Sequence, residues 1–278
     1  MIRLAVRVRR ERAELVLAEL LELAPGGVEE VEVGGGDVIE YAVYGAPGEL
    51  PALPEVTAAA GGALVEVRTS EVADDWDERW REFHRPLVLT MQDPSARLVV
   101  RPPWEPALEA DVELVIDPGQ AFGTGAHATT RLCLELMLGL PPSGAFLDLG
   151  CGSGVLAIAA ARLGWGPVAA VDFDPVAVSA AAENAAVNGV SIETGLHDLR
   201  SDPVVVAPTV AANLLRPLLL AWVGRLEDVS VLPERVIASG LLVGEADEVA
   251  SAFARVGLAE SERRESGDWA ALLLHPRA

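Results

Sequence analysis

The sequence feature that most constrains the fold is a glycine turn between an apolar run at residues 146–149 and a helical pattern at 155–163. Glycines alternate at Gly150, Gly152 and Gly154. Because glycine has no Cβ, a ligand can lie directly against the backbone of such a turn. The N-terminus of the following helix adds free N–H groups and a partial positive charge. The pattern therefore predicts a buried strand, a tight turn and a helix that together bind a nucleotide-type ligand.

The spacing of the glycines favours S-adenosylmethionine over NAD. The dinucleotide fingerprint is G-x-G-x-x-G, whereas here the pattern is D-x-G-x-G-x-G, beginning at Asp148. A carboxylate at Asp148 accepts hydrogen bonds from an ammonium group, which S-adenosylmethionine carries and NAD lacks. An ordinary strand–helix junction without a ligand is the alternative.

A second carboxylate follows at the distance that adenosine recognition requires. Asp172 ends the next predicted strand, about twenty residues after the turn, where an acid receives the two ribose hydroxyls. Either Asp172 or Asp174 could instead cap the helix that begins at Pro175. We assign Asp174 to the cap and Asp172 to the ribose.

Composition limits the classes of function. The chain has 278 residues and a net charge of −21, all its basic residues are arginine, and it has two cysteines, Cys133 and Cys151. Such acidity argues against a nucleic-acid surface and suits a basic protein partner, although a solubility bias or salt adaptation explains it equally well. The cysteines lack metal-ligand spacing, and we expect reduced thiols, no metal and a cytoplasmic location. No apolar run reaches the roughly 18–20 residues of a membrane span.

The N-terminal part predicts a small α+β domain, which we place at residues 1–70. Its expected elements are a strand, a helix, two strands, a weak helix and a strand, at residues 2–8, 11–23, 28–33, 38–43, 51–61 and 63–68. This order is that of a ferredoxin-like sandwich. Residues 71–86 predict a linker helix, in which Trp76, Trp80 and Phe83 share one face and brace the two domains.

Residues 87–278 predict a second, α/β domain. Strands are expected at 87–90, 97–101, 112–116, 190–194, 204–213, 235–239, 258–263 and 269–274, and helices at 131–140, 176–187, 214–226 and 245–256. Alternating strands and helices are typical of a Rossmann-like parallel sheet. The last two strands are expected to form a hairpin.

A glycine-rich loop at residues 117–130 is the second informative stretch. It carries Phe122, His127, Thr129 and Thr130, and a loop of this composition next to the cofactor turn could close over a ligand. Alternatively, the two threonines could be N-caps of the following helix, and His127 could be an ordinary loop histidine whose hydrogen bonds are made within the protein.

Asn213 ends a predicted strand, which is where ligands bind in open α/β sheets. From the residues alone, it is an equally good alternative that Asn213 caps a helix at residues 214–226.

Three stretches together resemble the PrmA family of methyltransferases: residues 123–130 (Gly-Thr-Gly-Ala-His-Ala-Thr-Thr), the glycine turn from Asp148 to residue 160, and residues 212–215 (Ala-Asn-Leu-Leu). The resemblance implies a seven-stranded class I methyltransferase sheet, an N-terminal ferredoxin-like domain that binds the substrate, and a linker helix. It also implies repeated methylation, from S-adenosylmethionine, of lysine side chains and the α-amino group of a basic large-subunit ribosomal protein.

Functional residues follow from the same resemblance. The family's cofactor contacts fall on Thr130, Gly150, Asp172 and Asn213, to which the glycine turn adds Asp148 and Gly152. Its active-site loop supplies Phe122, His127 and Thr129, whereas Ala128 departs from the usual proline or glutamate.

In the expected reaction Asn213 orients the amine, and His127 is the one nearby group that could take a proton. We expect a monomer that binds neither nucleic acid nor membrane. A methyltransferase for another protein or a small-molecule amine, an inactive cofactor-binding module and an NAD-binding protein remain the alternatives.

Overall fold

The computed structural model describes residues 2–24, 28–33, 37–45, 50–71, 85–91, 93, 96–117 and 127–277. The chain divides into two compact units, Met1–Phe83 and His84–Ala278. Each unit has its own sheet and its own apolar core. Residues 72–84 of the predicted linker helix lie outside the described residues, as does Phe122.

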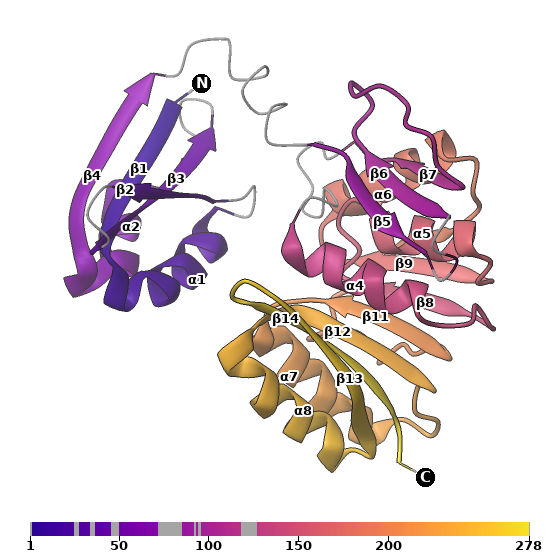
Figure 1. Ribbon diagram of the computed structural model, residues 1–278. Helices are drawn as coiled ribbons and strands as arrows, with labels where there is room; N and C mark the ends of the chain where they lie inside the picture. Colours follow the sequence, from indigo (N-terminus) through magenta and orange to yellow (C-terminus); the bar gives the residue numbers. More distant parts are fainter. Residues whose placement is uncertain are drawn as a thin grey trace. The chain divides into compact units, whose positions relative to one another are not determined.

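The smaller unit has the βαββαβ order predicted from the sequence. Its elements are β1 (Ile2–Arg9), α1 (Ala13–Leu23), β2 (Glu29–Val33), β3 (Val38–Gly45), α2 (Leu53–Ala60) and β4 (Leu64–Glu71). The strands form an antiparallel sheet in the order β2-β3-β1-β4, and both helices lie on one face of it (Figure 1). This is ferredoxin-like topology, which confirms the expected fold of this part.

Alternation along β1 separates the two faces of this sheet. Leu4 and Val6 are buried in the cluster that includes Leu20 of α1, because successive strand residues point to opposite faces. On the other face Arg3 and Arg7 each pair with Glu40 at 2.6 Å.

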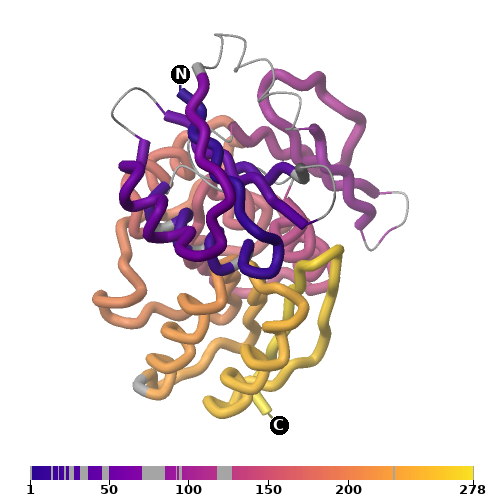
Figure 2. The backbone as a smooth tube through the Cα atoms, turned by 90° about the vertical axis from the view of Figure 1, so that its left-hand side faces the viewer, coloured from indigo at the N-terminus to yellow at the C-terminus, as the bar shows by residue number. Residues whose placement is uncertain are grey.

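The larger unit is built on a seven-stranded sheet in the order β10-β9-β8-β11-β12-β14-β13. Its strands are β8 (Phe146–Leu149), β9 (Val168–Asp172), β10 (Glu193–Leu196), β11 (Thr209–Asn213), β12 (Arg235–Leu242), β13 (Leu258–Ser266) and β14 (Trp269–Pro276). Pairing is parallel from β10 to β12 and antiparallel from β12 through β14 to β13. The predicted seven-stranded sheet and its final hairpin are confirmed. Figure 2 shows the yellow end of the chain, β13 and β14, beside the orange segments of β12 and α8.

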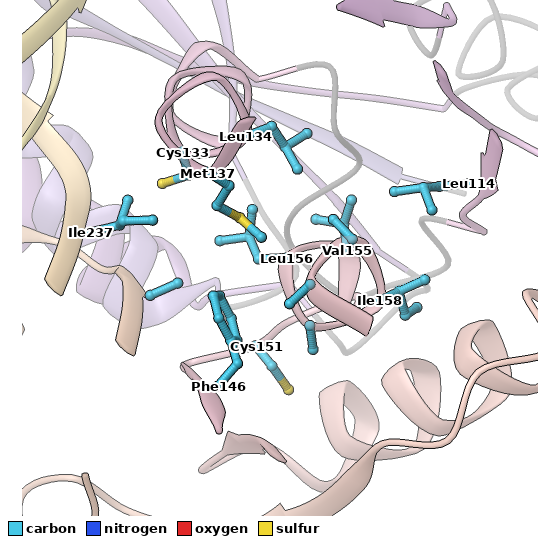
Figure 3. Close-up of a cluster of buried hydrophobic side chains, with 14 of the residues drawn as sticks. Leu114, Cys133, Leu134, Met137, Phe146, Cys151, Val155, Leu156, Ile158 and Ile237 are labelled. Atoms are coloured by element: carbon cyan, nitrogen blue, oxygen red, sulfur yellow. The ribbon is translucent and has the colours of Figure 1, made fainter. Parts of the chain in front are cut away.

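Helices cover both faces of this sheet (Figure 1). They are α4 (Ala128–Leu138), α5 (Val155–Leu163), α6 (Pro175–Val187), α7 (Arg216–Arg225) and α8 (Ala246–Arg255). In β8, Phe146 packs in the core with α4 and α5, whereas Leu147 packs in the core with α7 and α8. Figure 3 shows Met137 of α4 directed toward Leu156 of α5. Burial on both faces explains why these strands read as continuous apolar runs.

A three-stranded sheet extends the first of these cores. It consists of β5 (Leu87–Thr90), β6 (Arg97–Arg101) and β7 (Val112–Val115), with β5 antiparallel and β7 parallel to β6. Leu89, Leu98 and Leu114 are buried with the side chains of α4 and α5. The predicted pairing of 87–90 with 97–101 is confirmed.

Several predicted boundaries are wrong by three residues or more. The apolar run 204–213 is a strand only from Thr209, because Pro203 and Pro208 flank a segment that packs on the core without a strand ladder. The strand expected at 190–194 is found at Glu193–Leu196. No helix in the described ranges is long and apolar enough to cross a membrane.

Candidate active site

The glycine turn after β8 adopts a conformation that only glycine takes easily. Gly150, Gly152 and Gly154 have φ values of +75°, +51° and +80°, which lie in the left-handed region. A Cβ on Gly150 would lie 2.4 Å from Cδ2 of Leu214, and one on Gly154 would lie 2.8 Å from Cβ of Ala181. The turn is therefore held closely between β11 and α6, with its backbone at the carboxyl edge of the sheet.

Asp172, at the end of β9, is tied to this turn. One carboxylate oxygen accepts from the backbone N–H of Gly152 and the other from that of Asp174, both at 3.0 Å. Each oxygen has a second lone pair that can accept a ligand hydroxyl. Asp174, rather than Asp172, caps α6 by accepting from the N–H of Val176 at 2.8 Å, as expected.

Asp148, at the end of β8, is buried. Its Oδ2 accepts from the N–H of Ala157 at 3.0 Å, while Oδ1 has no hydrogen-bond partner among the described residues. Burial, with a smaller contribution from the charge of Asp172, raises the pKa of Asp148 to about 7. An unpaired buried carboxylate oxygen is costly, and the ammonium group of S-adenosylmethionine is a ligand that would satisfy it.

A second group of predicted residues gathers at the start of α4. His127 is the N-cap of this helix, and its Nδ1 accepts from the N–H of Thr129 at 3.3 Å. Thr130 is fully buried, and its Oγ1 accepts from Nδ2 of Asn213 at 3.4 Å. The helix therefore begins at Ala128 rather than at the predicted residue 131, and the cap is the histidine rather than a threonine.

His127 is held as a neutral ring. Since a backbone N–H can only donate, Nδ1 is the acceptor, and the hydroxyl of Thr129, 2.8 Å away, donates to it as well. Burial lowers the pKa of His127. Trp269 of β14 packs against the ring edge-to-face, with 4.9 Å between ring centroids and 71° between planes.

Both groups meet at one edge of the sheet. Asp148 and Ala211 are partners in the parallel pairing of β8 and β11, so Gly150 and Asn213, two residues further on, lie at adjacent strand ends. The chain leaves β8 toward β9 on one side, and β11 lies on the other. Ligands of open α/β sheets bind outside the carboxyl ends of the strands at such a switch point.

Sequence reasoning missed two exposed apolar side chains at this edge. Phe173 follows Asp172 directly and is 70% exposed, and Leu196, the register partner of Asp172 on β10, is 64% exposed. Large apolar side chains exposed beside a ribose-type carboxylate suit the flat face of a purine. A phenylalanine directly after the strand-end acid was the signal in the sequence.

A parallel sheet that closes with an antiparallel hairpin and presents a glycine turn at its switch point is the architecture of class I S-adenosylmethionine-dependent methyltransferases, and this chain has it. Comparison with known proteins gives the family. The family model described as Ribosomal protein L11 methyltransferase (PrmA) matches residues 53–276. The chain belongs to this family and is an S-adenosylmethionine-dependent methyltransferase, as the resemblance implied.

Individual members of this family are similar in sequence to most of the chain. The ribosomal protein L11 methyltransferase of Pelotomaculum thermopropionicum is 40% identical over 223 residues, 78% of this chain and 71% of that protein. The protein of the same name from Symbiobacterium thermophilum is 36% identical over 273 residues, 92% of this chain and 84% of that one. The crystal structure of a ribosomal protein L11 methylase from Lactobacillus delbrueckii subsp. bulgaricus superposes with a TM-score of 0.57 at 30% identity, covering 65% of this chain and 95% of that chain.

Proposed function

We propose that this enzyme methylates, repeatedly, the lysine side chains and α-amino terminus of ribosomal protein L11. The observation that carries the proposal is the 36% identity, over 92% of the chain, to a protein named for that activity. The net charge of −21 suits a basic substrate. Both cysteines are unpaired and buried, which supports a cytoplasmic location.

The residues at the sheet edge suit S-adenosylmethionine part by part. Asp172 would accept the ribose hydroxyls, and Asp148 would accept from the ammonium group. Phe173 and Leu196 would flank the adenine. Gly150 and Gly152 would admit the ligand to the backbone, and the further contacts that the family implies would come from Thr130 and Asn213, which lie together.

The bound cofactor supplies a methyl group on a sulfonium, which is already activated for displacement. The protein has to align the amine with that methyl group and exclude water, and alignment alone can supply roughly 7–11 kcal/mol. Because the Nδ2 of Asn213 donates to Thr130, its carbonyl oxygen is the atom that can accept an amine N–H and direct the nitrogen lone pair. The amine must be neutral, so the site has to bind the rare unprotonated form of a lysine.

Transfer of labelled methyl groups from S-adenosylmethionine to purified L11 tests this function. We expect incorporation at more than one amine, located by mass spectrometry of L11 peptides. An Asp172→Ala variant, which lacks the proposed ribose contact, is expected to transfer little label. Tight binding of S-adenosylmethionine without incorporation would show that the enzyme methylates a substrate other than L11. Binding of NAD alone would overturn the assignment of S-adenosylmethionine as the cofactor.

His127 is expected to act as a helix cap and not as a proton acceptor. A His127→Ala variant should lower activity and destabilise α4 by about 0.5–2 kcal/mol, while the pH dependence of the rate keeps its shape. His127→Asn is the matched control, because its side-chain oxygen can cap the helix but cannot titrate, and it should restore most of the activity. Loss of the same limb of the pH–rate profile in both variants would instead identify His127 as the base.

A further inference from the structure

Asn184 of α6 joins two segments that are remote from it in sequence. Its side chain is 3% exposed. Its Oδ1 accepts from the N–H of Asp117 at 2.9 Å, and its Nδ2 donates to the carbonyl of Asp117 at 3.0 Å and to that of Ser153 at 2.9 Å. Asp117 follows β7, whereas Ser153 lies inside the glycine turn. One buried amide therefore connects the end of β7 to the turn.

A second contact places the same face of α6 against the turn. Ala181, three residues before Asn184, lies so close to Gly154 that a Cβ there would be 2.8 Å from its own Cβ. Residues three apart share one face of a helix. Ser153 is itself fully buried, so water cannot readily replace the amide as the partner of its carbonyl oxygen.

Asn188, one helical turn later, makes a similar pair of hydrogen bonds to β7 but none to the glycine turn among the described residues. Its Oδ1 accepts from the N–H of Val115 at 2.8 Å, and its Nδ2 donates to the carbonyls of Val115 at 2.7 Å and Asn184 at 2.8 Å. Within the described residues these bonds reach β7 and the helix and do not reach the glycine turn. Asn188 is therefore a matched control, because it anchors β7 with the same chemistry.

We propose that Asn184 is a positioning residue that fixes the glycine turn in its ligand-binding conformation by tying Ser153 to the end of β7. The proposal rests on the assignment of this turn to the cofactor. Removing the amide takes this hydrogen bond from the carbonyl of the fully buried Ser153 and from both backbone groups of Asp117, and a hydrogen bond lost at a buried group is costly. The turn then loses its hydrogen bond to α6, while Asp172 still holds it from β9.

Two measurements on Asn184→Ala and Asn188→Ala test this role. The first is amide hydrogen exchange of Gly152 and Gly154 in the protein without cofactor, where their N–H groups bond to Asp172 and Cys151. We expect exchange about tenfold faster in Asn184→Ala and little changed in Asn188→Ala. The second is the Kd for S-adenosylmethionine by calorimetry, which should rise about tenfold in the first variant only.

Melting temperatures separate positioning from general loss of stability, since both variants are expected to melt earlier than the parent. Equal effects of the two substitutions on exchange and on Kd would overturn the proposal. Should Asn184→Ala fail to fold, Asn184→Ser, which keeps a small donor, takes its place with the same expected order. If the parent protein did not bind S-adenosylmethionine, the proposed function would fail, whereas the exchange comparison would still decide whether Asn184 anchors the turn.

Discussion

Replacing Gly240 with alanine is expected to remove a large part of the stability of the protein and to abolish methyl transfer by the folded enzyme. Gly240 has φ +82°, and a Cβ there would lie 2.4 Å from the backbone oxygen and 2.7 Å from the carbonyl carbon of Leu214. Backbone atoms cannot rotate away as a side chain can. The left-handed conformation and the overpacking together predict a loss of about 2–5 kcal/mol in the free energy of unfolding.

The collision reaches the site because of what Leu214 touches. Its N–H donates to the carbonyl of Ser239 at 3.0 Å, its side chain packs against Gly150, and it follows Asn213 in the chain. Moving its backbone therefore shifts the amide that we assign to the amine and the turn that we assign to the cofactor. Chemical denaturation and the rate of methyl transfer would both measure the effect.

Gly189 is the control for this substitution. It also has a positive φ, +63°, but a Cβ there would have no atom of the described residues within 4 Å. Gly189→Ala should therefore lower the free energy of unfolding only by the cost of the left-handed backbone conformation, about 1–2 kcal/mol. The kinetics of the folded enzyme should be unchanged. Similar losses in the two variants would show that the contact with Leu214 relaxes without cost.

Local features of this chain could be predicted because their chemistry lies in a short stretch of sequence. The glycine turn, Asp148 and Asp172 are each determined by a strand, the residue that ends it and the turn that follows. Alternating apolar residues in the N-terminal part likewise predicted the four strands of the smaller sheet. Such features need no knowledge of what packs against them.

Features that depend on distant partners could not be predicted in this way. Asn184 sits in an alanine-rich helix, and its role depends on Asp117 and Ser153, which only the folded chain brings to it. His127 is an uncommon helix cap, so the helix appeared to start after the threonines. The stretch before Thr209 is apolar because it packs on the core, and apolarity alone does not separate a packed segment from a strand.

The affinity for S-adenosylmethionine is expected to depend on pH through Asp148. The pKa of this buried carboxyl is raised to about 7, above its unfolded value of about 3.9. In the absence of ligand, its contribution to stability is therefore fully present below that unfolded value and is lost as the pH rises through about 7. An ammonium group beside Oδ1, for which the described residues supply no hydrogen bond, reverses this preference, because it favours the ionised carboxylate.

Binding should therefore weaken as the pH falls, since below about 7 the ligand has to displace a proton from Asp148. We expect the Kd to rise about tenfold for each pH unit below 7, and to rise again above about 8, where an α-amino group loses its own proton. An Asp148→Asn variant should bind about 10- to 100-fold more weakly at pH 7.5. Below pH 7 its Kd should change little, and its stability should no longer fall as the pH rises through 7. Calorimetry with S-adenosylmethionine across this pH range measures the binding effects.

Methylthioadenosine separates a contact with the ammonium group from a general effect on the turn. This nucleoside keeps the adenosine and the sulfur but lacks the amino-acid part of the cofactor. Its Kd should depend little on pH and be similar in the parent and in Asp148→Asn, because Asp172 and the apolar pair Phe173 and Leu196 still bind it. An equal loss of affinity for both ligands would show that Asp148 acts only through its bond to Ala157, as an anchor for the start of α5. The assignment of Asp148 to the ammonium group would then be wrong, and the buried carboxylate would serve to hold the fold rather than to bind the cofactor.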